Sequence, residues 1–293
     1  MANKRLSGKS AVVTGSGSAG IGKAVALGLA AEGAKVVVND IGTNAEGARL
    51  ADVVVKQIKD AGGTAVANYD SVATMEGGTN IVKTAVSNFG KIDILINCAG
   101  VFKSMATQNM TEKDWDLVMS VHLKGHFACS KAAMIEMMRQ KSGCIINFSS
   151  RGSFHGPPVL HANPDFSCLA YNTAKAGILG FTTALASELR DYGITVNCML
   201  PSAITTLFPY EKKPLTDNIP VADHTEPEYV VPVVVYLASD EAAKITGQYF
   251  YSSGGDICVY GRPLQLPGPH TFMHKPDKWT FEELSKFIPT VIK

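Results

Sequence analysis

The sequence lacks the features by which several classes of protein are recognised. Its 27 lysine and arginine residues nearly balance 26 aspartate and glutamate residues, with no basic block, which argues against a nucleic-acid partner. No apolar run approaches the roughly 18 residues that a membrane-spanning helix needs, and the nearest candidate, residues 230–238, contains Pro232. The amino-terminal residues MANKRLSGKS are mostly polar, which argues against a secretion signal.

Paired cysteines are also missing. The six cysteines form no CxxC pair, and most lie in apolar segments, such as Cys144 in GCIINF and Cys198 in VNCML. This pattern favours buried thiols in a reducing compartment over a disulfide framework. With 46% hydrophobic and 18% charged residues, the composition excludes a disordered chain. We therefore expect a soluble, cytoplasmic, globular protein that acts on a small molecule.

What the sequence does contain is an alternation of short β-branched runs with longer segments of helical periodicity. Strands are predicted at residues 10–14, 35–39, 64–68, 92–97, 144–148 and 195–200, and helices at 22–31, 45–61, 75–89, 111–140 and 171–192. Strands that are apolar nearly throughout are typical of a parallel sheet with helices on both faces. The predicted fold class is α/β, a doubly wound, Rossmann-type parallel sheet in a single domain.

A glycine-rich segment, TGSGSAGIG at residues 14–22, lies between the first predicted strand and the first predicted helix. Glycines at such a turn let backbone N–H groups approach a pyrophosphate at the positive end of the helix. Asp40 ends the second predicted strand, where a carboxylate can accept both ribose hydroxyls of an adenosine and repel a 2′-phosphate. With no arginine beside Asp40 in the sequence, the pattern predicts NAD rather than NADP. A plain strand-to-helix turn and a surface acid are the alternative interpretations.

Tyr171 and Lys175, four residues apart in YNTAK, share one face at the start of a predicted helix. A phenol, with a pKa of about 10, is a poor acid–base catalyst at neutral pH, and a nearby ammonium lowers that pKa. Ser150 follows a predicted strand and is suited to hydrogen-bond a substrate oxygen. Alone, Tyr-x-x-x-Lys is better explained as ordinary helix surface. Together with the glycine loop and Asp40, it predicts a proton-transfer site.

On these residues the chain resembles the short-chain dehydrogenase/reductase family, over about residues 6–260. Further matches are Asp70 in NYDSV, NCAG at residues 97–100 and PSAITT at residues 201–206. The resemblance implies that Asp70 holds the adenine edge, that the NCAG turn lines the cofactor, and that the PSAITT loop contacts its nicotinamide end. The implied NAD-binding residues are Gly15, Ser18, Gly20, Ile21, Gly22, Asp40, Asp70, Asn97, Ala99, Gly100, Tyr171, Lys175, Pro201, Ile204 and Thr206.

The segments VVVND, AVANYDSV, VHLKGHF and EPEYVVPVVVYL resemble more closely the D-3-hydroxyacyl-CoA dehydrogenase part of the peroxisomal multifunctional β-oxidation enzymes. This resemblance implies a secondary-alcohol substrate, either a 3-hydroxyacyl-CoA or a bulky cyclic, steroid-like alcohol. Substrate choice transfers poorly between relatives, so the two stay open. Relatives associate through the helices that correspond to residues 111–140 and 171–192, so a homo-oligomer, tetramer or dimer, is expected.

The chain departs from the family pattern at four places. The glycine loop has one residue more than usual between Gly15 and Gly20, Ser202 replaces a glycine, and His122 replaces the asparagine of the catalytic tetrad. Ser150 and Tyr171 are 21 residues apart, more than in relatives. The expected catalytic residues are therefore Ser150, Tyr171, Lys175 and His122. A second hypothesis, a non-catalytic partner subunit of a hetero-oligomer, is disfavoured by the intact serine, tyrosine and lysine.

Further expectations concern the segment between Ser150 and Tyr171, the carboxyl-terminal tail, and the histidines and cysteines near the site. The residues added between Ser150 and Tyr171 are expected to lie over the substrate entrance, or else to form a plain solvent loop. Residues 1–260 are expected to form the NAD-binding domain, and residues 261–293 a proline-rich tail with a short amphipathic helix. His122 and His126 lack a third ligand, so no metal site is expected. Cys98 and Cys168 are interpreted as packing residues.

Overall fold

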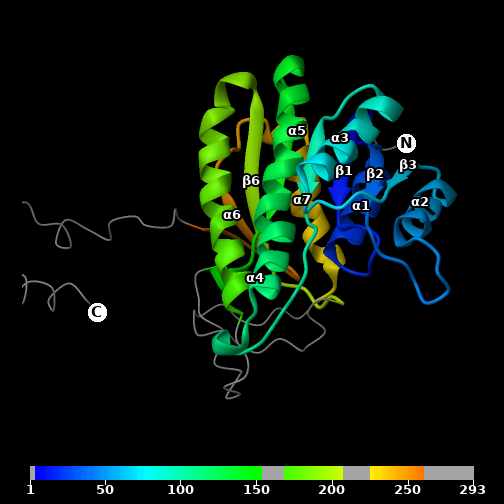
Figure 1. Cartoon of the computed structure of the whole chain (residues 1–293). Helices are drawn as coiled ribbons and strands as arrows, with labels where there is room; N and C mark the ends of the chain where they lie inside the picture. The colour runs from blue at the N-terminus through cyan, green and yellow to red at the C-terminus, as the bar shows by residue number, and fades with distance from the viewer. Residues whose placement is uncertain (1–3, 154–167, 207–224, 261–293) are drawn as a thin grey trace, which may run out of the picture. The chain divides into compact units, whose positions relative to one another are not determined.

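Eight strands form a single sheet in the order β3-β2-β1-β4-β5-β6-β7-β8 (Figure 1) within the residues described by the computed structural model, which are 4–153, 168–206 and 225–260. The seven strands β1 to β7 are parallel, and β8 pairs antiparallel with β7. Their bounds are Ser10–Thr14 (β1), Lys35–Asn39 (β2), Thr64–Asn68 (β3), Ile94–Asn97 (β4), Gly143–Phe148 (β5), Ile194–Pro201 (β6), Tyr249–Ser253 (β7) and Asp256–Tyr260 (β8).

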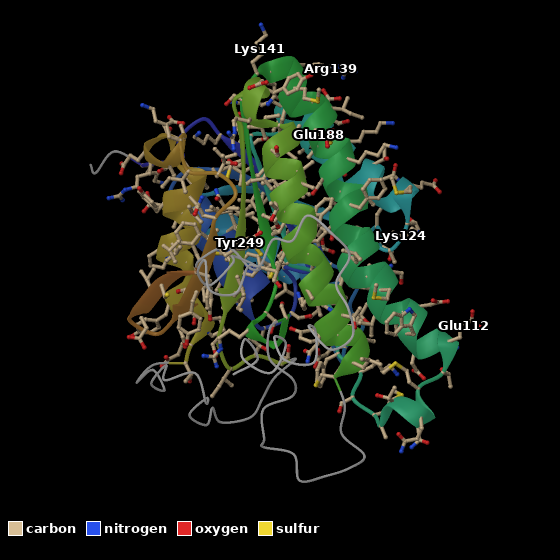
Figure 2. The ribbon with its side chains drawn as sticks, turned by 90° about the vertical axis from the view of Figure 1, so that its left-hand side faces the viewer. Glu112, Lys124, Arg139, Lys141, Glu188 and Tyr249 are labelled. Carbon is tan, nitrogen blue, oxygen red and sulfur yellow. The ribbon has the colours of Figure 1, made fainter. Side chains whose placement is uncertain are left out.

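Helices connect these strands. Their bounds are Ile21–Ala31 (α1), Leu50–Asp60 (α2), Met75–Phe89 (α3), Glu112–Met119 (α4), Gly125–Gln140 (α5), Leu169–Glu188 (α6) and Val231–Ala238 (α7). A π-helical turn, Ser120–Lys124, joins α4 to α5, and α6 packs beside this continuous helical segment (Figure 2). No helix in the described part of the chain is long and apolar enough to span a membrane.

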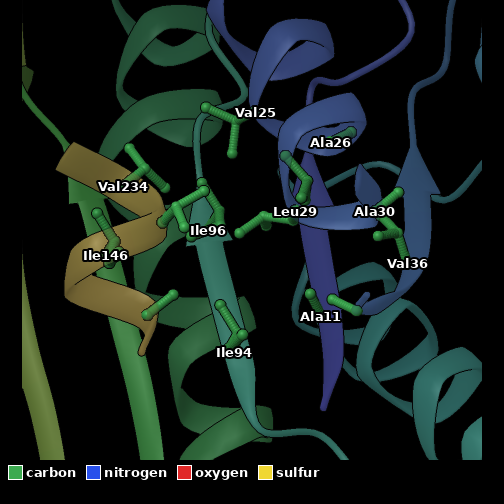
Figure 3. Close-up of a cluster of buried hydrophobic side chains, with 14 of the residues drawn as sticks. Ala11, Val25, Ala26, Leu29, Ala30, Val36, Ile94, Ile96, Ile146 and Val234 are labelled. Carbon is green, nitrogen blue, oxygen red and sulfur yellow. The ribbon is translucent and has the colours of Figure 1, made fainter. Parts of the chain in front are cut away.

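Both faces of the sheet are covered by helices, and successive strand residues enter opposite layers. Val13 of β1 belongs to a core cluster with residues of α1, α2 and α7, whereas its neighbour Val12 packs with residues of α3, α5 and α6. Figure 3 shows the first of these layers, where Leu29 of α1 lies close to Ile96 of β4. Because each strand is buried on both sides, its sequence is apolar without alternation. This arrangement confirms the predicted doubly wound α/β fold.

The structure corrects several predicted boundaries. The helix expected over residues 45–61 begins only at Leu50, because residues 43–49 turn back on themselves through a bridge between Thr43 and Arg49. The fourth strand begins at Ile94 rather than residue 92. The helix predicted from Thr111 has the expected cap, since the Thr111 side chain accepts from the N–H of Asp114, but the π turn interrupts it. Strands β7 and β8 and helix α7 were not predicted from the sequence, and the predicted tail lies outside the described residues.

Candidate active site

The candidate site lies at the carboxyl edge of the parallel strands, where β1 and β4 are neighbours although β2 and β3 separate them in the chain. Such a switch in strand order leaves a position for a dinucleotide above the strand ends. The Thr14 hydroxyl at the end of β1 accepts from the N–H groups of Cys98 (3.0 Å) and Ala99 (3.1 Å). This pair of hydrogen bonds holds the NCAG turn against the glycine loop.

The glycine loop has the geometry of a phosphate-binding turn. Gly15 adopts a φ of +64°, and a Cβ placed on it would lie 2.6 Å from the Cα of Ala99. A Cβ on Gly22 would collide with the carbonyl oxygen of Gly15, so only glycine lets α1 start this close to β1. Gly20 caps α1 without any side-chain hydrogen bond, and Ile21 begins the helix. The first N–H groups of α1 therefore suit an anionic group such as a pyrophosphate.

Asp40 is buried at the end of β2 beside this loop and accepts hydrogen bonds from the loop backbone. Its Oδ2 accepts from the N–H groups of Gly17 (2.9 Å) and Ser18 (3.2 Å), and its Oδ1 accepts from the N–H of Gly42 (2.8 Å). Oδ2 thus accepts two hydrogen bonds, whereas Oδ1 has a second lone pair with which it can accept a ribose hydroxyl. The extra residue of the loop is thus accommodated by hydrogen bonds to the acid that the sequence singled out.

Asparagines at the strand ends organise the rest of this edge. Asn97 donates to the hydroxyl of Ser130 and to the side-chain oxygen of Asn147, both at 2.9 Å, so its amide is engaged inside the fold. Asp70 accepts from the side-chain amides of Asn68 (2.8 Å) and Asn80 (3.1 Å) at the end of β3. Asp70 is held in a fixed orientation, which fits the adenine-side role implied by the resemblance.

The PSAITT loop after β6 returns to the glycine loop. Thr206 donates from its N–H (3.4 Å) and its hydroxyl (2.9 Å) to the carbonyl of Ala19, and the N–H of Ile204 donates to the carbonyl of Thr225 (2.8 Å). Pro201 ends β6. The structure therefore brings together the first and last segments of the predicted cofactor site, which lie far apart in the sequence.

Tyr171, Lys175 and Ser150 meet where α6 begins above the end of β5. The ammonium of Lys175 lies 5.5 Å from the centre of the Tyr171 ring and donates to the carbonyl of Phe148 at 2.7 Å. A hydrogen bond links the side chains of Tyr171 and Ser150. Tyr171 and Lys175 are 7% and 5% exposed, so water is largely excluded from both groups. The predicted proton-transfer group is therefore assembled in one place.

Burial dominates the ionisation of these groups. It raises the pKa of Tyr171 above its ordinary value, and the hydrogen bond from Ser150 only partly offsets this effect. Burial also lowers the pKa of Lys175 from 10.5 to about 8. We expected the ammonium to lower the phenol pKa below its usual value, but in this structure desolvation of the ring raises that pKa instead.

The comparisons with known proteins agree with this geometry. A family model described as enoyl-(acyl carrier protein) reductase matches residues 16–256. A crystal structure of a short chain dehydrogenase from Mycobacterium avium is similar with a TM-score of 0.82 and 36% identity, covering 98% of this chain and 95% of that one. The chain belongs to the short-chain dehydrogenase/reductase family. It is accordingly an oxidoreductase of a family that typically uses NAD or NADP.

Two curated relatives show different contexts for this short-chain dehydrogenase/reductase domain. The chain is 40% identical over 260 residues to the peroxisomal hydratase-dehydrogenase-epimerase of Neurospora crassa, covering 86% of this chain and 27% of that protein. It is 41% identical over 255 residues to a 3-oxoacyl-[acyl-carrier-protein] reductase of Synechocystis, covering 86% of this chain and 98% of that protein. The chain therefore spans about a quarter of the length of the first relative. Because that relative is peroxisomal by name, the cytoplasmic location stays a prediction.

His122, where short-chain dehydrogenases usually have asparagine, is fully buried in the π turn. Its Nε2 lies 2.7 Å from the carbonyl oxygen of Val101 and 3.1 Å from the N–H nitrogen of the same residue. Its ring packs edge-on against Tyr171, with centroids 5.2 Å apart at 89°. Burial first, and then the charge of Lys175, keep the pKa of His122 well below 6.5. The ring is therefore neutral near pH 7.

Two cysteines near the site are not suited to nucleophilic chemistry. Burial raises the pKa of Cys98 to about 12 and that of Cys168 to about 11. A thiol reacts as its thiolate, so both side chains are inert at neutral pH. This agrees with their interpretation as packing residues.

Arg49 is a residue near the cofactor edge that reasoning from the sequence missed. Its guanidinium donates to the carbonyl of Ile41 (3.4 Å), next to Asp40, and lies over the ring of Tyr69 at 5.2 Å. Eight residues separate Arg49 from Asp40, and the turn before α2 brings the Arg49 guanidinium to the carbonyl of Ile41, the residue after Asp40. The signal in the sequence was the Gly-rich stretch between them. The longer segment between Ser150 and Tyr171 falls largely outside the described residues, at 154–167.

Proposed function

We propose that the chain is an NAD-dependent dehydrogenase that interconverts a 3-hydroxyacyl thioester and the corresponding 3-oxoacyl thioester. The observation that carries this proposal is the meeting of Ser150, Tyr171 and Lys175 where α6 begins. The names of relatives support the substrate class, since one is a hydratase-dehydrogenase-epimerase and the other a 3-oxoacyl-[acyl-carrier-protein] reductase. No observation favours the non-catalytic alternative.

Each residue has a role that its surroundings allow. A bound nicotinamide dinucleotide supplies the hydride acceptor. Tyr171 takes the proton of the substrate hydroxyl, and Ser150, which is hydrogen-bonded to Tyr171, orients that hydroxyl. Lys175 retains its charge at pH 7, since its pKa is about 8, and stabilises the phenolate of Tyr171, which takes this proton in the oxidation direction and is regenerated when the phenol gives its proton to the carbonyl oxygen in the reduction direction. Burial keeps this proton transfer away from bulk water.

The choice of NAD over NADP depends on two groups of opposite charge. The Asp40 carboxylate disfavours a 2′-phosphate, and it lies against the glycine loop itself. Arg49, which would favour that phosphate, is held by the ring of Tyr69 and the carbonyl of Ile41. We infer a preference for NAD because the acid is fixed at the loop, whereas the guanidinium already has partners.

Replacing Asp40 tests this preference. Asp40→Ala is expected to lower kcat/KM for NAD at least tenfold, about 1.4 kcal/mol, because a ribose hydroxyl loses a charged acceptor. Because Asp40 also holds backbone N–H groups, Asp40→Asn and circular dichroism spectra of both variants separate cofactor recognition from loop folding. Arg49→Ala, the matched control, is expected to leave NAD kinetics unchanged. A wild-type enzyme that prefers NADP would overturn the cofactor proposal.

The substrate is tested by following NADH absorbance with purified protein. A 3-hydroxyacyl-CoA is expected to be oxidised with NAD, and Tyr171→Phe is expected to lower kcat at least a hundredfold, because the general base is lost. The panel includes the corresponding acyl-carrier-protein thioester and a cyclic steroid alcohol. Turnover of the steroid alone would contradict the thioester proposal while leaving the dehydrogenase chemistry in place.

A further inference from the structure

The π turn between α4 and α5 places His122 against two parts of the active site. Its ring contacts the backbone of Val101, the residue after the NCAG turn, and packs edge-on against Tyr171 on α6. We infer that His122 is a positioning residue that fixes Tyr171 relative to the NCAG turn and does not transfer a proton in the reaction. This inference rests on the role proposed above for Tyr171.

Packing shows that position 122 and the NCAG turn are fitted to each other. A Cβ placed on Gly100 would lie 2.6 Å from Cε1 of His122 and 3.4 Å from both ring nitrogens. The imidazole therefore occupies the space next to residue 100 and leaves no room for a side chain there. An edge-on ring pair at 5.2 Å also gives Tyr171 a preferred orientation. His122 thus fixes the π turn, the NCAG turn and α6 relative to one another.

The hydrogen bonds of His122 oppose a role in proton transfer. If Nε2 carries the proton, it donates to the Val101 carbonyl, and Nδ1 is left as a buried acceptor without a partner among the described residues. In the other neutral tautomer Nε2 accepts from the Val101 N–H (3.1 Å), and Nδ1 becomes a buried donor without a partner among the described residues. In both tautomers the ring is held by the backbone of Val101, and a doubly protonated ring would bury a charge together with an unpaired donor.

The backbone at this position is also engaged. The carbonyl of His122 accepts from Nδ1 of His126 at 2.6 Å and from the N–H of Gly125. The other titratable groups near the ring do not supply it with a proton. Lys175 is a cation that disfavours protonation of His122, and burial lowers the pKa of His126 to about 3. The carbonyl thus already accepts two hydrogen bonds, and Nδ1 of the ring faces no donor or acceptor among the described residues, so neither has a partner for a proton relay.

Nuclear magnetic resonance of protein labelled with ¹⁵N-histidine tests the state of the ring without using activity. The signal missing in His122→Asn identifies His122. We expect a neutral ring that does not titrate across the neutral pH range, whereas exposed histidines titrate near pH 6.5. Titration of His122 near that value would overturn the inference.

Kinetics of a double-mutant cycle test the positioning itself. Gly100→Ala and His122→Ala are each expected to lower kcat at least tenfold, the first because its Cβ displaces the ring. The double variant is expected to be no worse than His122→Ala, because removing the ring makes room for the new methyl group. Additive losses would contradict the fit between these two positions.

The pH profile separates positioning from proton transfer. His122→Asn is expected to lower kcat by the same factor at every pH, leaving the shape of the profile unchanged. Loss of one limb of the profile would show that His122 carries a proton. Lys124→Ala, an exposed residue of the same π turn (Figure 2), is the control and is expected to match the wild type. If the wild type shows no activity that depends on Tyr171, the proposed function fails, while the resonance experiment still tests the ring.

Discussion

At the scale of single residues, the site keeps a cation and a phenol almost entirely out of water. The ammonium of Lys175 makes one hydrogen bond, to the carbonyl of Phe148, in the part of the chain that the structure describes. Burying a charge with so few partners costs free energy, which is why its pKa falls to about 8. This cost is consistent with the catalytic role that we propose for Lys175.

Replacing this lysine by an apolar side chain is expected to raise stability and abolish activity. Lys175→Met removes the buried charge, so we expect the free energy of unfolding at pH 7 to rise by about 1–3 kcal/mol while dehydrogenase activity disappears. Urea denaturation measures the first effect and NADH absorbance the second. Lys124→Met, on the exposed surface, is the control and is expected to change stability by less than about 0.5 kcal/mol. A less stable Lys175→Met would show that the ammonium contributes net stability.

The pH dependence of this difference has a definite sign. Between pH 8 and 10.5 the unfolded chain binds more protons at Lys175 than the folded chain does, because the folded pKa is the lower one. The wild type therefore gains stability relative to Lys175→Met as the pH rises through this window. Below pH 8 both states are protonated and the full cost is present. Denaturation curves that run parallel for the two proteins across the window would contradict this assignment.

At the scale of elements, α3 and α5 approach each other through a glycine. A Cβ on Gly78 of α3 would lie 2.7 Å from the backbone carbon and 2.8 Å from the Cβ of Ala128 on α5. Gly78→Ala is therefore expected to lower the free energy of unfolding by about 1–3 kcal/mol, because the two helices must separate. Urea denaturation measures the change.

Gly180 of α6 is the matched control, since a Cβ there meets nothing within 4 Å. Gly180→Ala is expected to raise stability by up to about 1 kcal/mol through helix propensity alone. Equal effects of the two substitutions would show that the close approach at Gly78 is relieved by small shifts of the helices.

At the scale of the whole molecule, α5 presents large apolar side chains that are exposed in the part of the chain that the structure describes. Phe127 and Ile135 are each 45% exposed and share one face of the helix. We propose that this face is buried between copies of the chain in the expected homo-oligomer. Phe127→Asp and Ile135→Asp are expected to lower the particle mass toward the 31.1 kDa of one chain.

Light scattering after size-exclusion chromatography measures this mass. Val53→Asp on α2, where the replaced side chain is 38% exposed, is the matched control and is expected to leave the assembly intact. A wild-type protein that already has the mass of one chain would contradict the proposed homo-oligomer.

Much of this molecule could be predicted from local pattern. The apolar runs specify strands such as Val36–Val38 because a strand buried on both faces needs no polar residue. The spacing of Tyr171 and Lys175 places them on one side of a helix wherever that helix lies. Other segments escaped prediction: β8 is exposed along most of its length, and β7 ends in two serines.

The sequence alone determined the fold class, the glycine turn and the residues that carry the proposed chemistry, because these depend on spacing within short segments. Tertiary structure decided which groups from distant parts of the chain contact these residues. The three N–H groups on Asp40, Arg49 beside that acid and His122 against Gly100 all arise when strand ends from separate segments come together at one edge of the sheet. Burial decided the pKa values in the same way, because the solvent exclusion that shifts them comes from residues remote in the chain.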